Sequence, residues 1–260
     1  MLKNKNVLIT GSTSGIGLAI AEGFAYQNAN LIINGITPED NCSAILQELS
    51  NKTKGKVLYV QADLIQVCEI ESMINKAFSE LGSVDVLINN ACIQHVSPIE
   101  SFENDKWDQI IALGLSSAFH TSKLCLPKMR ENNWGRIINI ASAHGIVASA
   151  HKAAYVAAKH GAIGLTKVIA LETAEANITC NAICPGWVLT PLVENQIKNN
   201  AEKNGWTYEH ATQELLREKQ PSMNFVKPDD IAQMSLFLCS EAANQITGSK
   251  FVVDGGWTAR

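Results

Sequence analysis

The sequence predicts a single α/β domain with a doubly wound parallel sheet. Three observations support this fold class. Short apolar runs alternate with longer helical patterns, as in chains of repeated strand–helix units. Several of the short runs are apolar almost throughout, which is typical of parallel strands covered on both faces. A glycine-rich turn joins the first run to the first helical pattern, as in folds that bind a nucleotide.

Each predicted element follows from this alternation. The strand patterns occupy residues 6–10, 30–34, 56–61, 84–89, 135–140, 178–184 and 249–253. The helical patterns between them cover about 15–28, 41–51, 66–81, 104–131, 152–176 and 229–240. Right-handed crossovers then place the ligand crevice at the carboxyl ends of the strands.

No linker, repeat or low-complexity segment divides the chain, so we expect one dinucleotide-binding catalytic domain over 1–260. Residues 187–226 carry no strand pattern, but they include an amphipathic run around 211–219. A long insertion between the last two strands is typical of a mobile lid. We therefore expect a helical lid over the substrate at about 187–226.

Composition excludes several classes of function. A net charge of −4 gives no support for nucleic-acid binding, and no apolar stretch reaches membrane-spanning length. The N-terminal residues pass straight into a strand pattern, without the features of a signal peptide. The seven cysteines are scattered and odd in number, which favours free thiols in a reducing compartment. We expect a cytoplasmic protein without a metal site.

The glycine-rich turn follows the pattern G-x-x-x-G-x-G from Gly11 to Gly17. Glycines permit a tight turn and close backbone approach, and the N-terminus of the following helix favours a pyrophosphate. The alternative is a strand–helix turn that binds no ligand. Because the turn lies between a strand and an amphipathic helix, we favour the nucleotide site.

The end of the second strand predicts NAD rather than NADP. An acidic residue there would bind the 2′-hydroxyl of the adenosine ribose, and an arginine would bind a 2′-phosphate. Asn34 and Gly35 provide neither group, so a 2′-phosphate would find little compensating charge. Asp63, after the third strand, is placed to accept from the adenine amino group, although it could instead cap the next helix.

Ser142, Tyr155 and Lys159 form the candidate catalytic set. On a helix, Tyr155 and Lys159 share one face because they are four residues apart. A nearby cation lowers the pKa of a phenol from about 10, so the phenol can exchange protons near neutral pH. The alternative is an ordinary helix that happens to contain a tyrosine and a lysine.

The glycine turn, the Asn-Asn-Ala run at 89–91 and the spacing of Ser142, Tyr155 and Lys159 together resemble the short-chain dehydrogenase/reductase family. The resemblance covers essentially the whole chain and implies a Rossmann-type, seven-stranded parallel sheet with a nicotinamide cofactor. It also implies that Tyr155 is the general acid/base, Ser142 orients the substrate oxygen, and Lys159 binds the nicotinamide ribose.

The resemblance and the strand ends together predict which residues contact the cofactor. These are Gly11, Thr13, Ser14, Gly15, Ile16, Gly17, Gly35, Asp63, Leu64, Asn90, Ala91, Tyr155, Lys159, Pro185, Gly186, Val188 and Thr190. Two positions depart from the family pattern. Cys92 replaces a usual glycine at the crevice wall, and Gly114 replaces a usual catalytic asparagine. In the family that asparagine supports a helix irregularity, and a glycine can itself permit a bend.

Donor side chains gather where the substrate is expected. Gln94 follows the fourth strand, and His144 and Lys152 follow the fifth. Such donors suit a small carboxylate, with Lys152 supplying the charge, while Trp187 offers an apolar wall. The alternative for Lys152 is a solvated residue at a helix start.

The stretches around Gln94, 142–155 and 185–191 resemble the 3-hydroxybutyrate dehydrogenases of this family. That resemblance implies carboxylate contacts from Gln94, His144, Lys152 and Gln196, a methyl pocket at Trp187, and further pocket residues Leu215 and Trp257. It implies reversible, NAD-dependent oxidation of D-3-hydroxybutyrate to acetoacetate, a reaction of ketone body metabolism, by a homotetramer.

Two other functions stay open at this point. A 3-ketoacyl-thioester reductase of the same family would prefer NADP and would need a pocket open to a long carrier arm. A non-catalytic nucleotide-binding module would fit the departures at Cys92 and Gly114. The missing partners for a 2′-phosphate speak against the reductase, and the intact Ser142, Tyr155 and Lys159 speak against the module.

Overall fold

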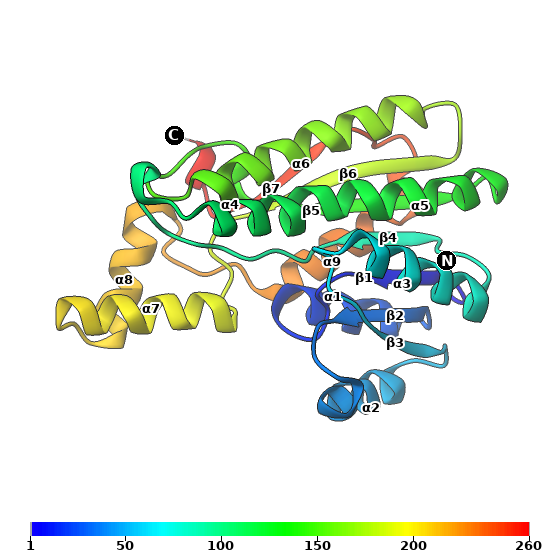
Figure 1. The fold of residues 1–260 in the computed structure, drawn as a ribbon, viewed down its shortest axis with the longest axis horizontal. Helices are drawn as coiled ribbons and strands as arrows, with labels where there is room; N and C mark the ends of the chain where they lie inside the picture. Colours follow the sequence, from blue (N-terminus) through cyan, green and yellow to red (C-terminus); the bar gives the residue numbers. More distant parts are fainter. Residues whose placement is uncertain (1, 260) are drawn as a thin grey trace.

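A computed structural model describes residues 2–259 and confirms the predicted fold class. One seven-stranded sheet has the order β3-β2-β1-β4-β5-β6-β7, and every strand pair is parallel (Figure 1). The strands are β1 Asn6–Ile9, β2 Asn30–Gly35, β3 Val57–Gln61, β4 Val86–Asn89, β5 Gly135–Ile140, β6 Ile178–Pro185 and β7 Lys250–Val253. All seven lie where the sequence places them, with ends shifted by two residues or fewer.

Helices connect the strands and cover both faces of the sheet. The α-helices are α1 Gly15–Tyr26, α2 Ser43–Lys52, α3 Val67–Leu81, α4 Asn104–Ile111, α5 Ser117–Glu131, α6 Ala153–Glu172, α7 Pro191–Asn204, α8 Tyr208–Lys219 and α9 Pro228–Leu238. The single helix expected at about 104–131 is instead two helices, joined by the π-helical turn Ala112–Ser116 (η3). The expected lid segment contains α7 and α8.

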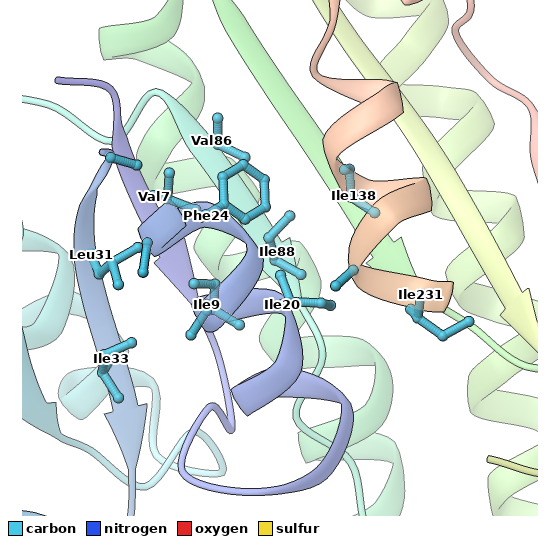
Figure 2. Packing of buried hydrophobic residues seen from close by; sticks show 14 of the residues in the cluster. Val7, Ile9, Ile20, Phe24, Leu31, Ile33, Val86, Ile88, Ile138 and Ile231 are labelled. Atoms are coloured by element: carbon cyan, nitrogen blue, oxygen red, sulfur yellow. The ribbon is translucent and has the colours of Figure 1, made fainter. Parts of the chain in front are cut away.

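The hydrophobic core is divided into two layers by the sheet. Apolar side chains of α1, α2 and α9 pack on one face, and those of α3, α5 and α6 pack on the other. Figure 2 shows Ile20 and Phe24 of α1 lying close to Val7, Ile9 and Ile88 of the sheet. Ile20 and Phe24 are fully buried, and burial of such a side chain contributes about 1.5–3 kcal/mol.

The chain order creates a switch point in the middle of the sheet. After β1 the chain builds outward through β2 and β3, and it then crosses back to β4, the other neighbour of β1. The connections leaving β1 and β4 therefore diverge, which opens a crevice at their carboxyl ends. The glycine turn follows β1 and the Asn-Asn-Ala run closes β4, so both border this crevice.

Helices α7 and α8 project beyond one end of the sheet (Figure 1). They pack on each other and contribute Val193, Ile197 and Leu215 to a small apolar cluster with Trp187 and Trp257. Among residues 2–259, no helix combines the length and apolar character that crossing a membrane requires.

Candidate active site

One cavity of about 600 Å³ runs across the carboxyl ends of the central strands. Its wall contains all but three of the residues that the sequence assigns to cofactor or substrate. The exceptions are Gly17, Gln196 and Leu215. The cavity has a cofactor end, around the glycine turn and Gly35, and a substrate end, around His144, Lys152 and Trp257.

The cofactor end is built mainly from backbone. Gly11 and Gly15 have φ angles of +59° and +55°, in the left-handed region that favours glycine. A Cβ on Gly17 would lie 2.3 Å from the Gly11 carbonyl oxygen and 2.6 Å from Asn90 Nδ2. Gly17 therefore lies behind the cavity wall, where its missing side chain lets the turn fold against α1.

Asn90 joins the two halves of the sheet at the switch point. Its Nδ2 donates to the carbonyl oxygens of Thr10 and Gly11 at 2.9 and 3.0 Å, and its backbone N–H donates to Thr10 Oγ1 at 2.9 Å. These bonds hold the glycine turn after β1 against the end of β4. The predicted importance of Asn90 thus has a geometric basis: it shapes the turn.

Within residues 2–259, no lysine or arginine lines the adenosine side of the cofactor end. A Cβ on Gly35 would approach Thr13 Cγ2 to 2.9 Å and the Tyr59 hydroxyl to 3.1 Å, so this glycine allows β2 to pass close to the turn. Asp63 Oδ1 accepts from the Ile65 backbone N–H at 3.0 Å, a local turn, whereas the N-cap of α3 is Gln66, so Asp63 does not cap the next helix. The wall here consists of glycine, small polar and apolar residues, together with the Asp63 carboxylate.

A nicotinamide dinucleotide fits this end of the cavity. Ser14, the N-cap of α1, makes no capping hydrogen bond with its side chain, so it leaves the first backbone N–H groups of the helix to a ligand. Those donors and the positive end of the helix dipole favour a pyrophosphate. Thr190 closes the opposite wall, with its Cγ2 3.3 Å from where a Gly15 Cβ would lie.

Ser142, Tyr155 and Lys159 converge between the two ends of the cavity. The Ser142 side chain hydrogen-bonds Tyr155 and also accepts from the His144 backbone N–H at 3.1 Å. Lys159 Nζ lies 5.6 Å from the centre of the Tyr155 ring and donates to the Ile140 carbonyl oxygen at 2.7 Å. The helix α6 therefore presents Tyr155 and Lys159 on one face, one turn apart, as their spacing predicts.

Opposing effects act on the Tyr155 phenol. Burial raises the pKa of Tyr155, whereas the Lys159 ammonium and the Ser142 hydrogen bond act to lower it. Burial acts to lower the pKa of Lys159, but interactions with Cys92 and Tyr155 outweigh burial and leave that pKa raised, so Lys159 stays charged. The pKa of Tyr155 is raised overall, and the charge on Lys159 is the largest effect that opposes this rise.

Gly114 and Cys92 face each other beside this pair. Gly114 lies in the π-helical turn, and a Cβ there would meet Cys92 Sγ at 3.0 Å and Ala158 Cβ at 3.2 Å. The helix irregularity thus exists without an asparagine at 114, because the glycine backbone adopts it. The Cys92 thiol lines the cavity and contacts Lys159, so the two departures from the family pattern occupy one shared space.

The substrate end combines a buried cation with unpaired donors. Lys152 is only 6% exposed, and its Nζ lies 5.0 Å from the centre of the Trp187 ring. Within residues 2–259, four buried side-chain N or O atoms lack a hydrogen-bond partner, and two of these, Gln94 Nε2 and Trp187 Nε1, belong to residues of this wall. Because unpaired buried donors are costly, they indicate a ligand that accepts hydrogen bonds.

His144 forms the centre of this end. Its ring packs edge-on against Trp257 and Tyr155, at 4.8 and 5.9 Å between ring centres. Burial, followed by the charges of Lys152 and Lys219, lowers the pKa of His144 to about 3. His144 is therefore neutral at physiological pH. The cation of this wall is Lys152, whose pKa is lowered to about 8 by burial and by Lys219, with Glu218 opposing.

Two predicted substrate residues lie on α7 and α8, outside the cavity wall. Gln196 is half-buried on α7, and Leu215 packs on α8 in the apolar cluster with Trp187 and Trp257. The structure also shows a residue that the sequence analysis missed. Lys219 reaches from α8 to within 5.5 Å of the Trp257 ring centre. Lys219 follows the buried residues Ala211 and Leu215 at intervals of four, so it lies on the same face of α8. A lysine in line with two apolar residues is the sequence signal that could have indicated its inward position.

Comparisons with known proteins define the class. The family model for short chain dehydrogenases matches residues 5–201. The D-beta-hydroxybutyrate dehydrogenase of Cupriavidus necator is 54% identical over 261 residues, which cover all of both chains. The enzyme of the same name from Rhizobium meliloti is 48% identical over 256 residues, covering 98% of this chain and 99% of the relative.

A solved structure supports the same class. The L-sorbose reductase of Gluconobacter frateurii, crystallised with NADPH and L-sorbose, superposes with a TM-score of 0.95 at 31% identity, covering 100% of this chain and 98% of its own. The chain therefore belongs to the short-chain dehydrogenase family, as its motifs predict. It is an oxidoreductase with a site for a nicotinamide cofactor.

Proposed function

We propose that this enzyme oxidises D-3-hydroxybutyrate to acetoacetate, reversibly and with NAD. The two hydroxybutyrate dehydrogenases that resemble it over their full length support the substrate and its chirality. The site supports the same substrate through its size and chemistry: a small cavity end with a buried ammonium, amide and imidazole donors, and two indoles.

One observation carries the proposal: the buried Lys152 shares the cavity wall with two donors that have no partner within residues 2–259. A carboxylate would supply the missing charge to Lys152 and the missing acceptor to Gln94 Nε2. Trp187 and Trp257 are stacked at 5.7 Å between ring centres and would pack against the C4 methyl group. A neutral substrate would leave the ammonium uncompensated.

In the proposed mechanism, Tyr155 removes the proton from the C3 hydroxyl while Ser142 donates a hydrogen bond to the same oxygen. When bound, the oxidised nicotinamide supplies the hydride acceptor. Lys159 stabilises the phenolate, and its contact with the Ile140 carbonyl fixes the ammonium in place. Lys152, His144 and Gln94 hold the carboxylate, which orients C3 toward Tyr155. In the reverse direction Tyr155 returns the proton to acetoacetate.

We further propose NAD rather than NADP. The segment from Asn34 to Asp40 contains no basic residue, and Asp63 adds a negative charge to the same wall. A 2′-phosphate would face this charge without a cation to balance it.

The lid over 187–226 would close on the occupied cavity through the apolar cluster that joins α7 and α8 to Trp187 and Trp257.

We propose a homotetramer in the cytoplasm. Phe119 of α5 and Val168 and Leu171 of α6 are 47%, 52% and 79% exposed, and such an apolar surface suits contact with further copies of the chain. All seven cysteines are free, as expected in a reducing compartment. Size-exclusion chromatography with light scattering gives the mass; a monomer would rule out the tetramer.

The formation of NADH, followed by absorbance, tests the proposed reaction. We expect turnover of D-3-hydroxybutyrate with NAD, weak turnover of the L-enantiomer, and weak turnover with NADP. Faster reduction of a 3-ketoacyl thioester with NADPH would replace the proposal by the thioester reductase. Binding of NAD without turnover of either substrate would support the non-catalytic module.

A further inference from the structure

A short hydrogen-bonded chain links the lid to the substrate end of the cavity. Lys219 Nζ, on α8, donates to Ser149 Oγ at 2.8 Å, and the same oxygen lies 2.8 Å from His144 Nε2. The Lys219 side chain is 17% exposed and also contacts Glu218 Oε1 at 3.1 Å. Neither Lys219 nor Ser149 belongs to the cavity wall. Lys219 can therefore act on a substrate in two ways: through Ser149 and His144, which the hydrogen-bonded chain joins, and through the repulsion between its charge and that of Lys152.

The chemistry of the three groups sets the direction of the chain. An ammonium can only donate, so Ser149 Oγ accepts from Lys219. The hydroxyl keeps one hydrogen, and among residues 2–259 His144 Nε2 is the only acceptor within reach of it. Accepting a bond from a cation strengthens the hydroxyl as a donor. Ser149 therefore donates to His144 Nε2.

This direction determines the state of the His144 ring. A neutral imidazole has one N–H and one lone pair, so a ring that accepts at Nε2 carries its hydrogen on Nδ1. His144 is neutral because burial and two nearby lysines lower its pKa to about 3. The nitrogen left for a ligand is then a donor. In the other tautomer that nitrogen would present a lone pair, which repels a carboxylate.

We infer that Lys219 is a positioning residue for substrate recognition: through Ser149 it fixes His144 as the Nδ1–H tautomer, so that His144 donates to the substrate carboxylate. The consequence for substrate rests on the proposed function, whereas the tautomer itself does not. Because Lys219 belongs to α8, movement of the lid would also make or break the chain. Lid position and the donor state of His144 are thereby coupled.

Nitrogen-15 NMR of the enzyme labelled at histidine tests the tautomer directly. We expect the His144 signals, assigned by their loss in His144→Gln, to show a protonated Nδ1 and an unprotonated Nε2. In Lys219→Met, Nε2 is expected to gain hydrogen, because Ser149 then becomes free to accept from it. Lys219→Arg keeps a donor and should keep the tautomer. An Nε2–H ring in the parent enzyme, or no change in Lys219→Met, would overturn the inference.

Kinetics test the effect on substrate. At pH 7, where Lys152 is largely charged with or without Lys219, Lys219→Met should raise KM for D-3-hydroxybutyrate about tenfold, the effect of losing one modest hydrogen bond. It should leave KM for the uncharged methyl ester nearly unchanged, and Lys219→Arg should restore the parent value. Arg217→Met, on the exposed side of the same helix, is the matched control and should change neither constant.

The two measurements separate the inference from the proposed function. A changed tautomer with an unchanged KM for D-3-hydroxybutyrate would overturn the role in substrate recognition. Equal increases in KM for the acid and its ester would do the same, because they would indicate general disruption of the lid. Failure of the parent enzyme to oxidise D-3-hydroxybutyrate would contradict the proposed function, and the NMR result would still decide the tautomer.

Discussion

The two ends of the cavity differ in the groups that line them: mainly backbone at the cofactor end and mainly side chains at the substrate end. At the cofactor end, glycines and main-chain groups create the shape, and Asn90 holds the turn to the neighbouring strand. At the substrate end, charged and aromatic side chains create the shape, and a second lysine, Lys219 of α8, lies behind them. The cofactor end should therefore be sensitive to added volume, and the substrate end to lost charge or lost donors.

The largest expected effect lies between the two ends. Tyr155→Phe removes the group that accepts the proton, and general base catalysis contributes about 10²–10⁴-fold. We expect kcat to fall by about 10³-fold while the affinity for NAD, measured by calorimetry, stays close to that of the parent enzyme. Substantial residual turnover would remove Tyr155 from its catalytic role.

Added volume should damage the cofactor end. In Gly17→Ala, the new Cβ would lie within 2.6 Å of both the Gly11 carbonyl oxygen and Asn90 Nδ2, so the turn must shift. We expect a loss of about 1–3 kcal/mol in stability and at least tenfold weaker NAD binding.

Gly23→Ala on the same helix is the matched control for this change. Its Cβ would meet Ala232 Cβ at an ordinary 3.4 Å, so the substitution should stabilise the protein by up to about 1 kcal/mol through helix propensity. Thermal unfolding and calorimetry measure both variants. Equal behaviour of the two would contradict the close-packed turn.

Raising the pH should weaken the substrate end alone. The pKa of Lys152 is lowered to about 8, first by burial and then by Lys219, while Glu218 opposes and His144 is neutral. The ammonium is present below this pKa and lost above it. We therefore expect kcat/KM for D-3-hydroxybutyrate to fall about tenfold per pH unit above about pH 8.

Two further pH profiles, for the methyl ester and for Lys219→Met, test whether the alkaline fall in kcat/KM is due to Lys152. The uncharged methyl ester should not show the alkaline fall, because it does not use the charge on Lys152. Lys219→Met removes a repelling charge and should move the fall to higher pH. A shared alkaline fall for acid and ester would assign it to another group.

The smallest effect is expected at the two departures from the family pattern. Gly114→Asn should keep activity within a few-fold of the parent value, because the π-helical turn already exists. The new Cβ would meet Cys92 Sγ at 3.0 Å, so Cys92→Gly should improve the Gly114→Asn variant. Steady-state rates of the single and double variants check this. A double variant slower than Gly114→Asn alone would contradict the expectation that Cys92 crowds a side chain at position 114.

The sequence was sufficient to predict the fold, and most of the residues it assigns to the site lie in one cavity wall, because both depend on local patterns. Strand–helix alternation predicts the sheet, and the positions of Ser142, Tyr155 and Lys159 follow from strand ends and helical spacing. The π-helical turn was not predicted, since Gly114 indicates a possible bend but not its hydrogen bonds. Lys219 was missed because its contact with Ser149 spans 70 residues and depends on how the lid packs.

The positions of Gln196 and Leu215 likewise could not be predicted from local sequence patterns, because they depend on how distant segments pack. They lie on α7 and α8, and the path of these helices keeps them out of the cavity wall. Family resemblance can assign a residue to a substrate pocket without indicating which position of a movable segment brings it there. Their roles as substrate contacts remain predictions for the closed form.

The central claim is that the enzyme recognises its substrate by charge at Lys152. The most direct measurement compares kcat/KM of Lys152→Met and the parent enzyme for D-3-hydroxybutyrate and for its uncharged methyl ester. We expect a loss of about 10- to 100-fold for the acid, the value of a charged hydrogen bond, and little loss for the ester. Equal losses for acid and ester would contradict the carboxylate site.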